Sequence, residues 1–211
     1  MERGIYLVGF SGSGKSTIAQ LIGERLAWQS CDLDELIVER SGMSIPLIFE
    51  KEGEAGFRAR ETEALIAASS QGKFVIATGG GIVVREENRA FMAENGWMIC
   101  LEAQPETLLG RMQEQRAKAD PRAARPMLDD GDPLEKIRTL KQARQSAYAL
   151  AHWTVHTDRL TGEQVVEEVI RAAEILDRSL LDRSLLDRSP LDQSLEHDKN
   201  RASDHAGAAS Q

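Results

Sequence analysis

Short apolar runs alternate along the chain with longer segments in which apolar residues recur at helical spacing. The short runs predict strands at residues 4–10, 28–32, 73–78, 97–103 and 153–157. The longer segments predict helices at residues 15–28, 32–42, 44–53, 54–72, 85–96, 105–115, 133–151 and 161–176. Strands that alternate with helices of this length indicate an α/β protein with a parallel sheet covered on both faces. In such sheets, ligands bind beyond the carboxyl ends of the strands.

Two segments fall outside this alternation. Residues 117–133 contain three prolines and no periodicity, which predicts a loop. From Asp177 the chain repeats DRSLL and then becomes polar, and a period of five makes no continuous apolar stripe on a helix. We therefore predict a folded domain over residues 1–176 and a low-complexity, disordered tail over residues 177–211, with an interaction helix as the alternative for the tail.

Composition narrows the classes of function. A chain of 211 residues that is 41% hydrophobic can bury one sizeable core. A net charge of −8 argues against a general nucleic-acid binder. The sequence has no apolar stretch typical of a signal peptide or a membrane span, so we predict a cytoplasmic protein. Cys31 and Cys100 lie in β-like apolar runs and are predicted to be buried thiols of a reducing compartment.

The segment GFSGSGKS, residues 9–16, matches the phosphate-binding loop G-x-x-x-x-G-K-[ST], and it follows a predicted strand and opens a predicted helix. Its glycines allow backbone N–H groups to surround phosphates, and the helix dipole adds positive potential. Lys15 is expected to reach the β- and γ-phosphates, and the Ser16 hydroxyl is expected to ligate Mg²⁺. The predicted nucleotide-binding residues in the loop are Gly12, Ser13, Gly14, Lys15, Ser16 and Thr17. This loop serves several reactions, so the acceptor must be inferred from other segments.

Two charged segments are candidates for the acceptor side. Asp32 and Asp34 follow the second predicted strand, and on extended backbone they would point to opposite sides, one toward Mg²⁺ and the other toward a substrate hydroxyl. The alternative is an acidic pair that only begins a helix. Arg58 lies early in a helix, where the dipole disfavours a cation, so it is a candidate for binding a carboxylate. The alternative for Arg58 is an ion pair with Glu61 or Glu63, and Arg60 cannot share its face.

Three glycines, Gly79, Gly80 and Gly81, follow the third predicted strand. A tight strand-to-helix turn would by itself explain them. Because this strand ends at the same sheet edge as the phosphate-binding loop, we expect bare backbone at these positions to border an acceptor and to donate N–H groups to it.

Six segments, GFSGSGKST, DLDE, EGEAGFRARE, ATGGG, RPML and RQSAY, occur in one order between about Ile5 and Asp158. In this order and spacing the chain is similar to the shikimate kinase family. The resemblance implies a P-loop, nucleoside monophosphate kinase-like fold with a five-stranded parallel sheet sandwiched by helices and a lid at about residues 112–130. It also implies a monomer that uses ATP and Mg²⁺ to phosphorylate the 3-hydroxyl of shikimate, in the biosynthesis of chorismate and aromatic amino acids.

The resemblance also implies roles for individual residues. Asp34 matches the aspartate that binds the ring hydroxyls and could act as a base, and Asp32 matches the residue near Mg²⁺. Arg58 matches the arginine that pairs with the substrate carboxylate, and Gly79, Gly80 and Gly81 match the loop that lines the acceptor pocket. Three further arginines match family positions: Arg125 the lid arginine over the phosphates, Arg144 a second carboxylate ligand, and Arg111 a residue that stacks on adenine. The implied catalytic set is Lys15, Asp34 and Arg125.

The chain departs from the family pattern in the lid and near the last strand. Thirteen residues separate Arg111 from Arg125, so Arg116, Lys118 and Arg122 compete with Arg125 for the phosphate role. His152 stands where the family commonly has aspartate, and we predict a partly buried structural histidine. Two other functions stay open: a kinase of another hydroxy acid such as gluconate, and a nucleotide-binding regulatory protein without catalysis.

Overall fold

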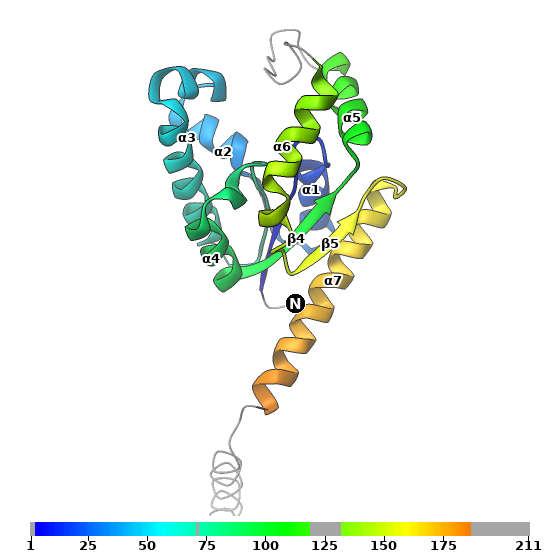
Figure 1. Cartoon of the computed structure of the whole chain (residues 1–211). Coiled ribbons are helices and arrows are strands. Elements are labelled where there is room, and N and C mark those ends of the chain that lie inside the picture. The colour runs from blue at the N-terminus through cyan, green and yellow to red at the C-terminus, as the bar shows by residue number, and fades with distance from the viewer. Residues whose placement is uncertain (1–2, 71, 119–131, 187–211) are drawn as a thin grey trace, which may run out of the picture. The chain divides into compact units, whose positions relative to one another are not determined.

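The computed structural model describes residues 3–70, 72–118 and 132–186 (Figure 1). By its internal contacts the chain divides into two units, Met1–Ala173 and Glu174–Gln211. The first unit contains the predicted sheet and the phosphate-binding loop. The described part of the second unit is helical.

The first unit is built on a five-stranded parallel sheet in the order β2-β3-β1-β4-β5. The strands are β1 (Gly4–Val8), β2 (Gln29–Asp32), β3 (Phe74–Ala77), β4 (Gly96–Glu102) and β5 (Trp153–His156). All four pairings are parallel, and Leu7 of β1 lies opposite Ala77 on one side and Ile99 on the other. The predicted fold class is therefore confirmed. The chain changes direction across the sheet at β1, and this switch point is where ligands bind in open α/β sheets.

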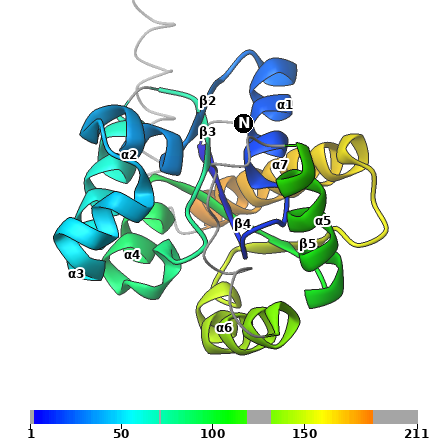
Figure 2. The same cartoon turned by 90° about the horizontal axis from the view of Figure 1, so that it is seen from above.

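Helices cover both faces of the sheet (Figure 2). In chain order they are α1 (Lys15–Leu26), α2 (Leu33–Ser41), α3 (Ile45–Ser69), the 3₁₀ helix η1 (Ile82–Val84), α4 (Glu86–Asn95), α5 (Pro105–Lys118), α6 (Pro133–Tyr148) and α7 (Gly162–Leu186). An ion pair joins Arg25 of α1 to Glu163 at the start of α7, so α1 and the part of α7 within the first unit lie on the same side of the sheet. The helices α3, α4 and α6 lie on the other side.

The two faces of β1 belong to two different sides of the core. Tyr6 and Val8 pack in one apolar cluster with Phe57 of α3 and Met92 of α4. Ile5 and Leu7 are equally buried and point to the opposite face, because side chains alternate along a strand. Every residue of β1 is buried, as expected for the central strand of a doubly covered parallel sheet.

The break predicted between the helices at residues 44–53 and 54–72 agrees with the structure: α3 is assigned as one element, but it is kinked at Gly53, whose φ of 68° and ψ of −174° are not helical. Two other predicted boundaries are wrong. The predicted loop at residues 117–133 begins too early, because α5 continues through Lys118. The tail predicted to be disordered from Asp177 is helical through Leu186. The reason is that no glycine or proline interrupts the repeat before Pro190, so the helix has no stop signal there. The remainder of the tail, residues 187–211, lies outside the described residues.

The cysteines and His152 have structural environments. Neither cysteine forms a disulfide; Cys100 is buried and Cys31, on an edge strand, is half-buried. Burial raises the pKa of the Cys100 thiol to about 12. His152 is partly buried, its Nδ1 accepts a hydrogen bond of 2.9 Å from the Met98 N–H, and its ring meets Trp97 edge-on. The prediction of a structural histidine agrees with these contacts. No helix among the described residues is long and apolar enough to cross a membrane.

We expect His152 to make stability depend on pH. Burial, followed by the charge of Arg3, lowers the pKa of His152 below its ordinary value of 6.5. The imidazole of the unfolded chain then binds a proton more readily than that of the folded protein. The contribution of neutral His152 to the free energy of unfolding is therefore present above about pH 6.5 and is lost as the pH falls through the pKa of the folded protein. Urea unfolding from pH 5 to 8 measures the effect. In His152→Asn the amide oxygen can accept the same hydrogen bond without titrating, so an unchanged pH dependence in this variant contradicts the prediction.

Candidate active site

The phosphate-binding loop connects β1 to α1 in a conformation that requires glycine. Gly9, Gly12 and Gly14 have φ values of 136°, 82° and 97°, which other residues rarely adopt. Gly14 is the N-cap of α1 and gives no side-chain cap, so the first N–H groups of the helix are available to an anion. The sequence prediction placed this loop after a strand and before a helix, and the structure agrees.

Lys15 is held inside the loop. Its side chain is buried, and Nζ donates a 2.9 Å hydrogen bond to the Phe10 carbonyl. Burial lowers the pKa of Lys15 to about 8, although Asp34 and then Asp32 oppose the shift. The ammonium group is therefore poorly solvated before a ligand arrives, and phosphate oxygens would be better partners than one carbonyl.

Asp32 and Asp34 are arranged differently from the prediction. Asp32 ends β2 and is the N-cap of α2, and its Oδ1 accepts a 2.9 Å hydrogen bond from the Asp34 N–H. Asp34 lies in the first helical turn, so the two residues do not alternate along extended backbone, and that expectation is wrong. The acidic pair does begin a helix, as the alternative held. Even so, the Ser16 hydroxyl donates to Asp32 Oδ2, and Asp34 is oriented toward Gly79.

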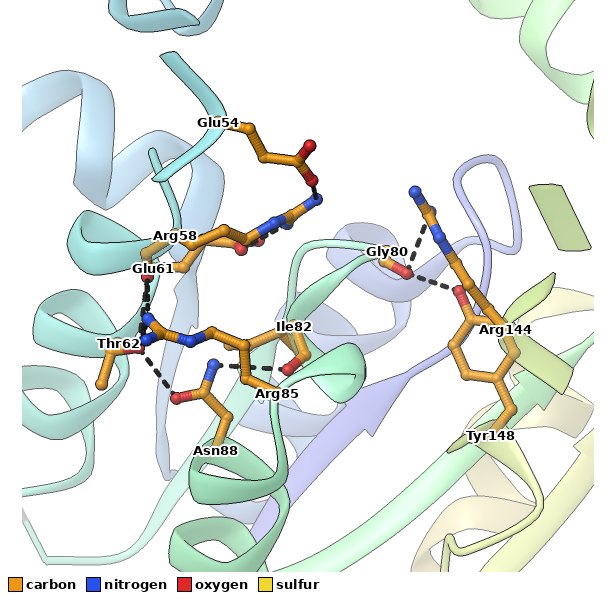
Figure 3. A network of polar contacts seen from close by, with 10 residues as sticks. All are labelled: Glu54, Arg58, Glu61, Thr62, Gly80, Ile82, Arg85, Asn88, Arg144 and Tyr148. Atoms are coloured by element: carbon orange, nitrogen blue, oxygen red, sulfur yellow. Dashed lines mark hydrogen bonds and ion pairs between the residues drawn. The ribbon is translucent and has the colours of Figure 1, made fainter. Parts of the chain in front are cut away.

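Arg58 makes an ion pair with Glu61, one of the two partners that the sequence offers as an alternative to a carboxylate ligand. Its Nη1 donates to Glu61 Oε2 at 2.5 Å, and its Nη2 donates to the exposed Glu54 at 3.2 Å (Figure 3). Arg60, two residues on, pairs instead with Glu52. Arg58 and Arg60 therefore have different environments, as their spacing predicted. Of these two arginines, Arg58 is the one that reaches the glycines after β3.

Glu61 is a site residue whose importance the sequence did not indicate. Its side chain is 1% exposed, and its Oε1 has no hydrogen-bond partner. Burial raises the pKa of the Glu61 carboxyl, Arg58 opposes the rise, and Asp34 adds to it. Among the described residues, the only other buried side-chain polar atom without a partner is Ser13 Oγ, in the phosphate-binding loop. Buried polar atoms of this kind are uncommon and are found at functional sites.

The glycines after β3 make room for these charged groups. A Cβ at Gly79 would lie 2.6 Å from Glu61 Oε1 and 3.1 Å from Asp34 Oδ1, and a Cβ at Gly81 would lie 2.5 Å from Arg58 Nη1. A Cβ at Gly80 would instead approach the Ser11 amide of the phosphate-binding loop at 3.3 Å. We call residues 79–81 the glycine turn. The structure gives a reason that the sequence analysis did not: the turn is bare because the site's own side chains occupy the space.

A second arginine approaches the glycine turn from α6. Arg144 Nη1 lies 3.2 Å from the Gly80 carbonyl oxygen, and its guanidinium stands over the Phe10 ring at 5.8 Å. Tyr148, one helical turn later, also donates to the Gly80 carbonyl (Figure 3). The sequence-predicted Arg58 and Arg144 therefore reach adjacent residues of one turn from two different helices.

A further network, which the sequence did not predict, connects α3 to the segment after the glycine turn. Buried Asn88 accepts a 2.9 Å hydrogen bond from the Thr62 hydroxyl, and its Nδ2 donates to the Ile82 carbonyl at 3.3 Å. Arg85 adds contacts to Thr62 and to the Arg58 carbonyl (Figure 3). This network holds the helix that carries Arg58 against the residue that follows the glycine turn.

Two other predictions concern the nucleotide side. Arg111 donates to the Thr157 hydroxyl at 2.9 Å and to the Thr157 carbonyl at 2.8 Å, which fixes it beside the end of β5. Its contact with adenine stays a prediction. Arg122 and Arg125 lie outside the described residues, as do the side chains of Arg116 and Lys118. The first part of the predicted lid, residues 112–118, belongs to α5.

Comparison with known proteins identifies the family. The family model described as "Shikimate kinase" matches residues 11–174. A shikimate kinase of Symbiobacterium thermophilum is 42% identical over 167 residues, which cover 79% of this chain and 93% of that protein. The chain belongs to the shikimate kinase family.

Solved structures agree with this family and its fold. The structure of "Shikimate kinase from Acinetobacter baumannii in complex with shikimate" has a TM-score of 0.75 and 34% identity, with 85% of this chain and 96% of that chain covered. A gluconokinase of Sinorhizobium meliloti has a TM-score of 0.56 at 15% identity, covering 87% of this chain and 98% of that one. At that identity the likeness concerns the fold alone.

Gly81→Ala tests whether the glycine turn serves the shikimate kinase site or only the fold. The added methyl group meets the flexible end of Arg58, so the guanidinium moves while the backbone stays. We expect the KM for the phosphoryl acceptor to rise about tenfold or more, as loss of a charge-assisted hydrogen bond implies, with a small change in thermal stability.

The matched control for this substitution is Gly110→Ala in α5, where an added Cβ meets nothing within 4 Å. This variant is expected to keep the KM of the parent protein. If Gly81→Ala loses much stability but keeps the KM of the parent protein, the glycine turn has a structural role only.

Proposed function

We propose that the chain transfers the γ-phosphate of ATP to the 3-hydroxyl of shikimate, giving shikimate 3-phosphate and ADP. One observation carries this proposal: Arg58 and Arg144 reach the same glycine turn from α3 and α6, next to the phosphate-binding loop. Two guanidinium groups that reach adjacent residues of one turn favour an acceptor that carries a carboxylate. Shikimate combines a carboxylate with ring hydroxyls. The product would enter the biosynthesis of chorismate and aromatic amino acids.

The ATP phosphates are assigned to the loop between β1 and α1. The N–H groups at the start of α1 and the Lys15 ammonium would neutralise the β- and γ-phosphates. Thr17 and the loop residues 12–16 complete the proposed nucleotide site. Lys15 would exchange the Phe10 carbonyl for a phosphate oxygen when ATP binds.

The residues present fit a magnesium ion. The Ser16 hydroxyl and the Asp32 carboxylate are in contact, and Mg²⁺ prefers oxygen ligands, usually one or two from the protein with the remainder from phosphate and water. We assign Ser16 and Asp32 as the residues that would hold it. When bound, Mg²⁺ would supply positive charge to the phosphate oxygens.

The acceptor is assigned to Asp34, Arg58, Arg144 and the glycine turn. The two arginines would bind the carboxylate and fix the ring, and Asp34 would accept a hydrogen bond from the hydroxyl that reacts. That oxygen attacks the γ-phosphorus as the bond to the bridging oxygen of ADP breaks, and the hydroxyl proton passes to Asp34. Positioning contributes most to such a transfer, so Asp34 serves first to orient the hydroxyl. Arg125 stays our proposed lid arginine.

The other readings are less well supported. A gluconate kinase has in its favour only a fold likeness, since the gluconokinase structure is 15% identical. A regulatory protein without catalysis would have no physical need for Lys15, Asp32, Asp34 and Arg58 in one site. The monomeric state and the cytoplasmic location stay predictions.

One assay tests the acceptor. ADP release is measured with ATP and Mg²⁺ against shikimate, quinate, gluconate and nucleoside monophosphates, and we expect release with shikimate. In Arg58→Ala the KM for shikimate should rise about 10- to 100-fold, which is the range for a lost charge-assisted hydrogen bond, while the KM for ATP stays near that of the parent protein.

Arg60→Ala is the matched control for this assay, because Arg60 lies on the same helix and pairs with Glu52 away from the glycine turn. It should leave both KM values unchanged. Absence of shikimate-dependent ADP release in the parent protein would overturn the proposed function.

The pKa of Lys15 predicts that ATP binding takes up a proton. At pH 8, near the lowered pKa of about 8, roughly half of the ligand-free protein holds a neutral Lys15, and bound phosphates favour the charged form. ATP affinity should therefore fall as the pH rises above 8. Calorimetry at pH 8 in two buffers of different ionisation enthalpy measures the uptake. Equal binding heats in the two buffers would contradict a depressed pKa.

A further inference from the structure

Tyr148 makes a hydrogen bond that the proposed reaction does not use directly. Its ring is 1% exposed at the end of α6, and its hydroxyl donates to the Gly80 carbonyl oxygen at 2.6 Å. Arg144 donates to the same oxygen at 3.2 Å (Figure 3). Two side chains of α6 therefore point at a single backbone carbonyl of the glycine turn.

The backbone at this point is a four-residue turn. The Ile82 N–H donates to the Gly79 carbonyl at 3.2 Å, so Gly80 and Gly81 are its two central residues. The peptide between them is the one that differs between type I and type II turns, which are related by a flip of that peptide. A flip would reverse the directions of the Gly80 carbonyl and the Gly81 N–H together, because the peptide is planar and trans.

The observed turn is one of two that its glycines allow. Gly81 has φ of −106° and ψ of −6°, which are close to the values of a type I turn. A type II turn needs a positive φ at this position, and glycine is the residue that adopts it most readily. With glycine on both sides of the peptide, local preference does not exclude the flipped form. Contacts with neighbouring groups therefore add to the selection of the observed form, beside the hydrogen bond from the Val84 N–H to the Gly81 carbonyl at 3.0 Å.

We propose that Tyr148 is a positioning residue that holds the Gly80–Gly81 peptide in the type I orientation, with its carbonyl toward α6 and the Gly81 N–H on the opposite side. This inference rests on the proposed function for its effect on catalysis. Arg144 alone cannot serve this purpose during the reaction, because its guanidinium is assigned to the acceptor carboxylate. Once Arg144 turns to that carboxylate, the Tyr148 hydroxyl is the donor that remains on Gly80.

The orientation matters because the turn lies between the two halves of the site. Gly80 lies against Ser11 of the phosphate-binding loop, and Gly81 lies under the Arg58 guanidinium. A flipped peptide would direct the Gly80 carbonyl away from α6. The Gly80 carbonyl oxygen would then lie on the side where the Gly81 N–H now points. Such an oxygen would repel a bound carboxylate, so the flipped form should bind the acceptor weakly and ATP normally.

Tyr148→Phe removes the hydroxyl and keeps the buried ring. We expect the KM for shikimate to rise about three- to tenfold, the range for one hydrogen bond, with the KM for ATP within about twofold of the parent value. Tyr6→Phe is the matched control, since Tyr6 is also fully buried and its hydroxyl donates at 2.8 Å to Ser69, the last residue of α3. This variant should lose similar stability and keep both KM values.

A measurement on the ligand-free protein separates this inference from the proposed function. Residual dipolar couplings of the Gly81 N–H bond report its direction. They are measured in Arg144→Ala, where Tyr148 keeps its hydrogen bond to Gly80, and should shift toward an average over two orientations when Tyr148→Phe is added. Unchanged couplings, or KM values that rise equally for shikimate and ATP, would overturn the role of Tyr148. If the parent protein does not phosphorylate shikimate but the couplings shift, the proposed function fails and the turn-holding role stands.

Discussion

The site depends on the close packing of charged side chains against the bare backbone of residues 79–81. Arg58 and Glu61 occupy the positions that side chains at Gly81 and Gly79 would fill, and Gly80 lies against the phosphate-binding loop. The glycine turn therefore sets the distance between the arginine of α3 and the loop after β1. If the turn were bulkier, both would have to move apart, and the transfer site between them would widen.

Most of the fold could be predicted because its signals are local. The alternation of strands and helices, the glycines with positive φ in the phosphate-binding loop and the aspartate that caps α2 each act over a few residues. Glu61 and Asn88 could not be found in this way. Each is one polar residue on an otherwise ordinary helix. Glu61 is important because it lies against Gly79, and Asn88 because it binds Thr62 and Ile82, and only the folded chain brings these residues together.

Two predictions failed because they used the wrong local geometry. Asp32 and Asp34 were placed on extended backbone, but the capping hydrogen bond from the Asp34 amide begins α2 between them. The lack of an apolar stripe after Asp177 predicts disorder, whereas residues 177–186 contain no residue that stops a helix and are helical. In both cases helix termini mattered more than the apolar pattern. Capping and stop signals decide where a helix begins and ends, while periodicity decides which face it buries.

The buried charged and polar groups suit a site for anionic and hydroxyl-bearing ligands. Lys15 is held by one carbonyl, Glu61 keeps an oxygen without a partner, and Arg144 rests on the Gly80 carbonyl. Each arrangement leaves a group that an anion or a hydroxyl would satisfy better. When phosphates and a carboxylate bind, the free energy of binding can therefore replace these intramolecular contacts with contacts to the substrates. Tyr148 is the exception, because its hydrogen bond to Gly80 can persist through that exchange and keep the turn in place.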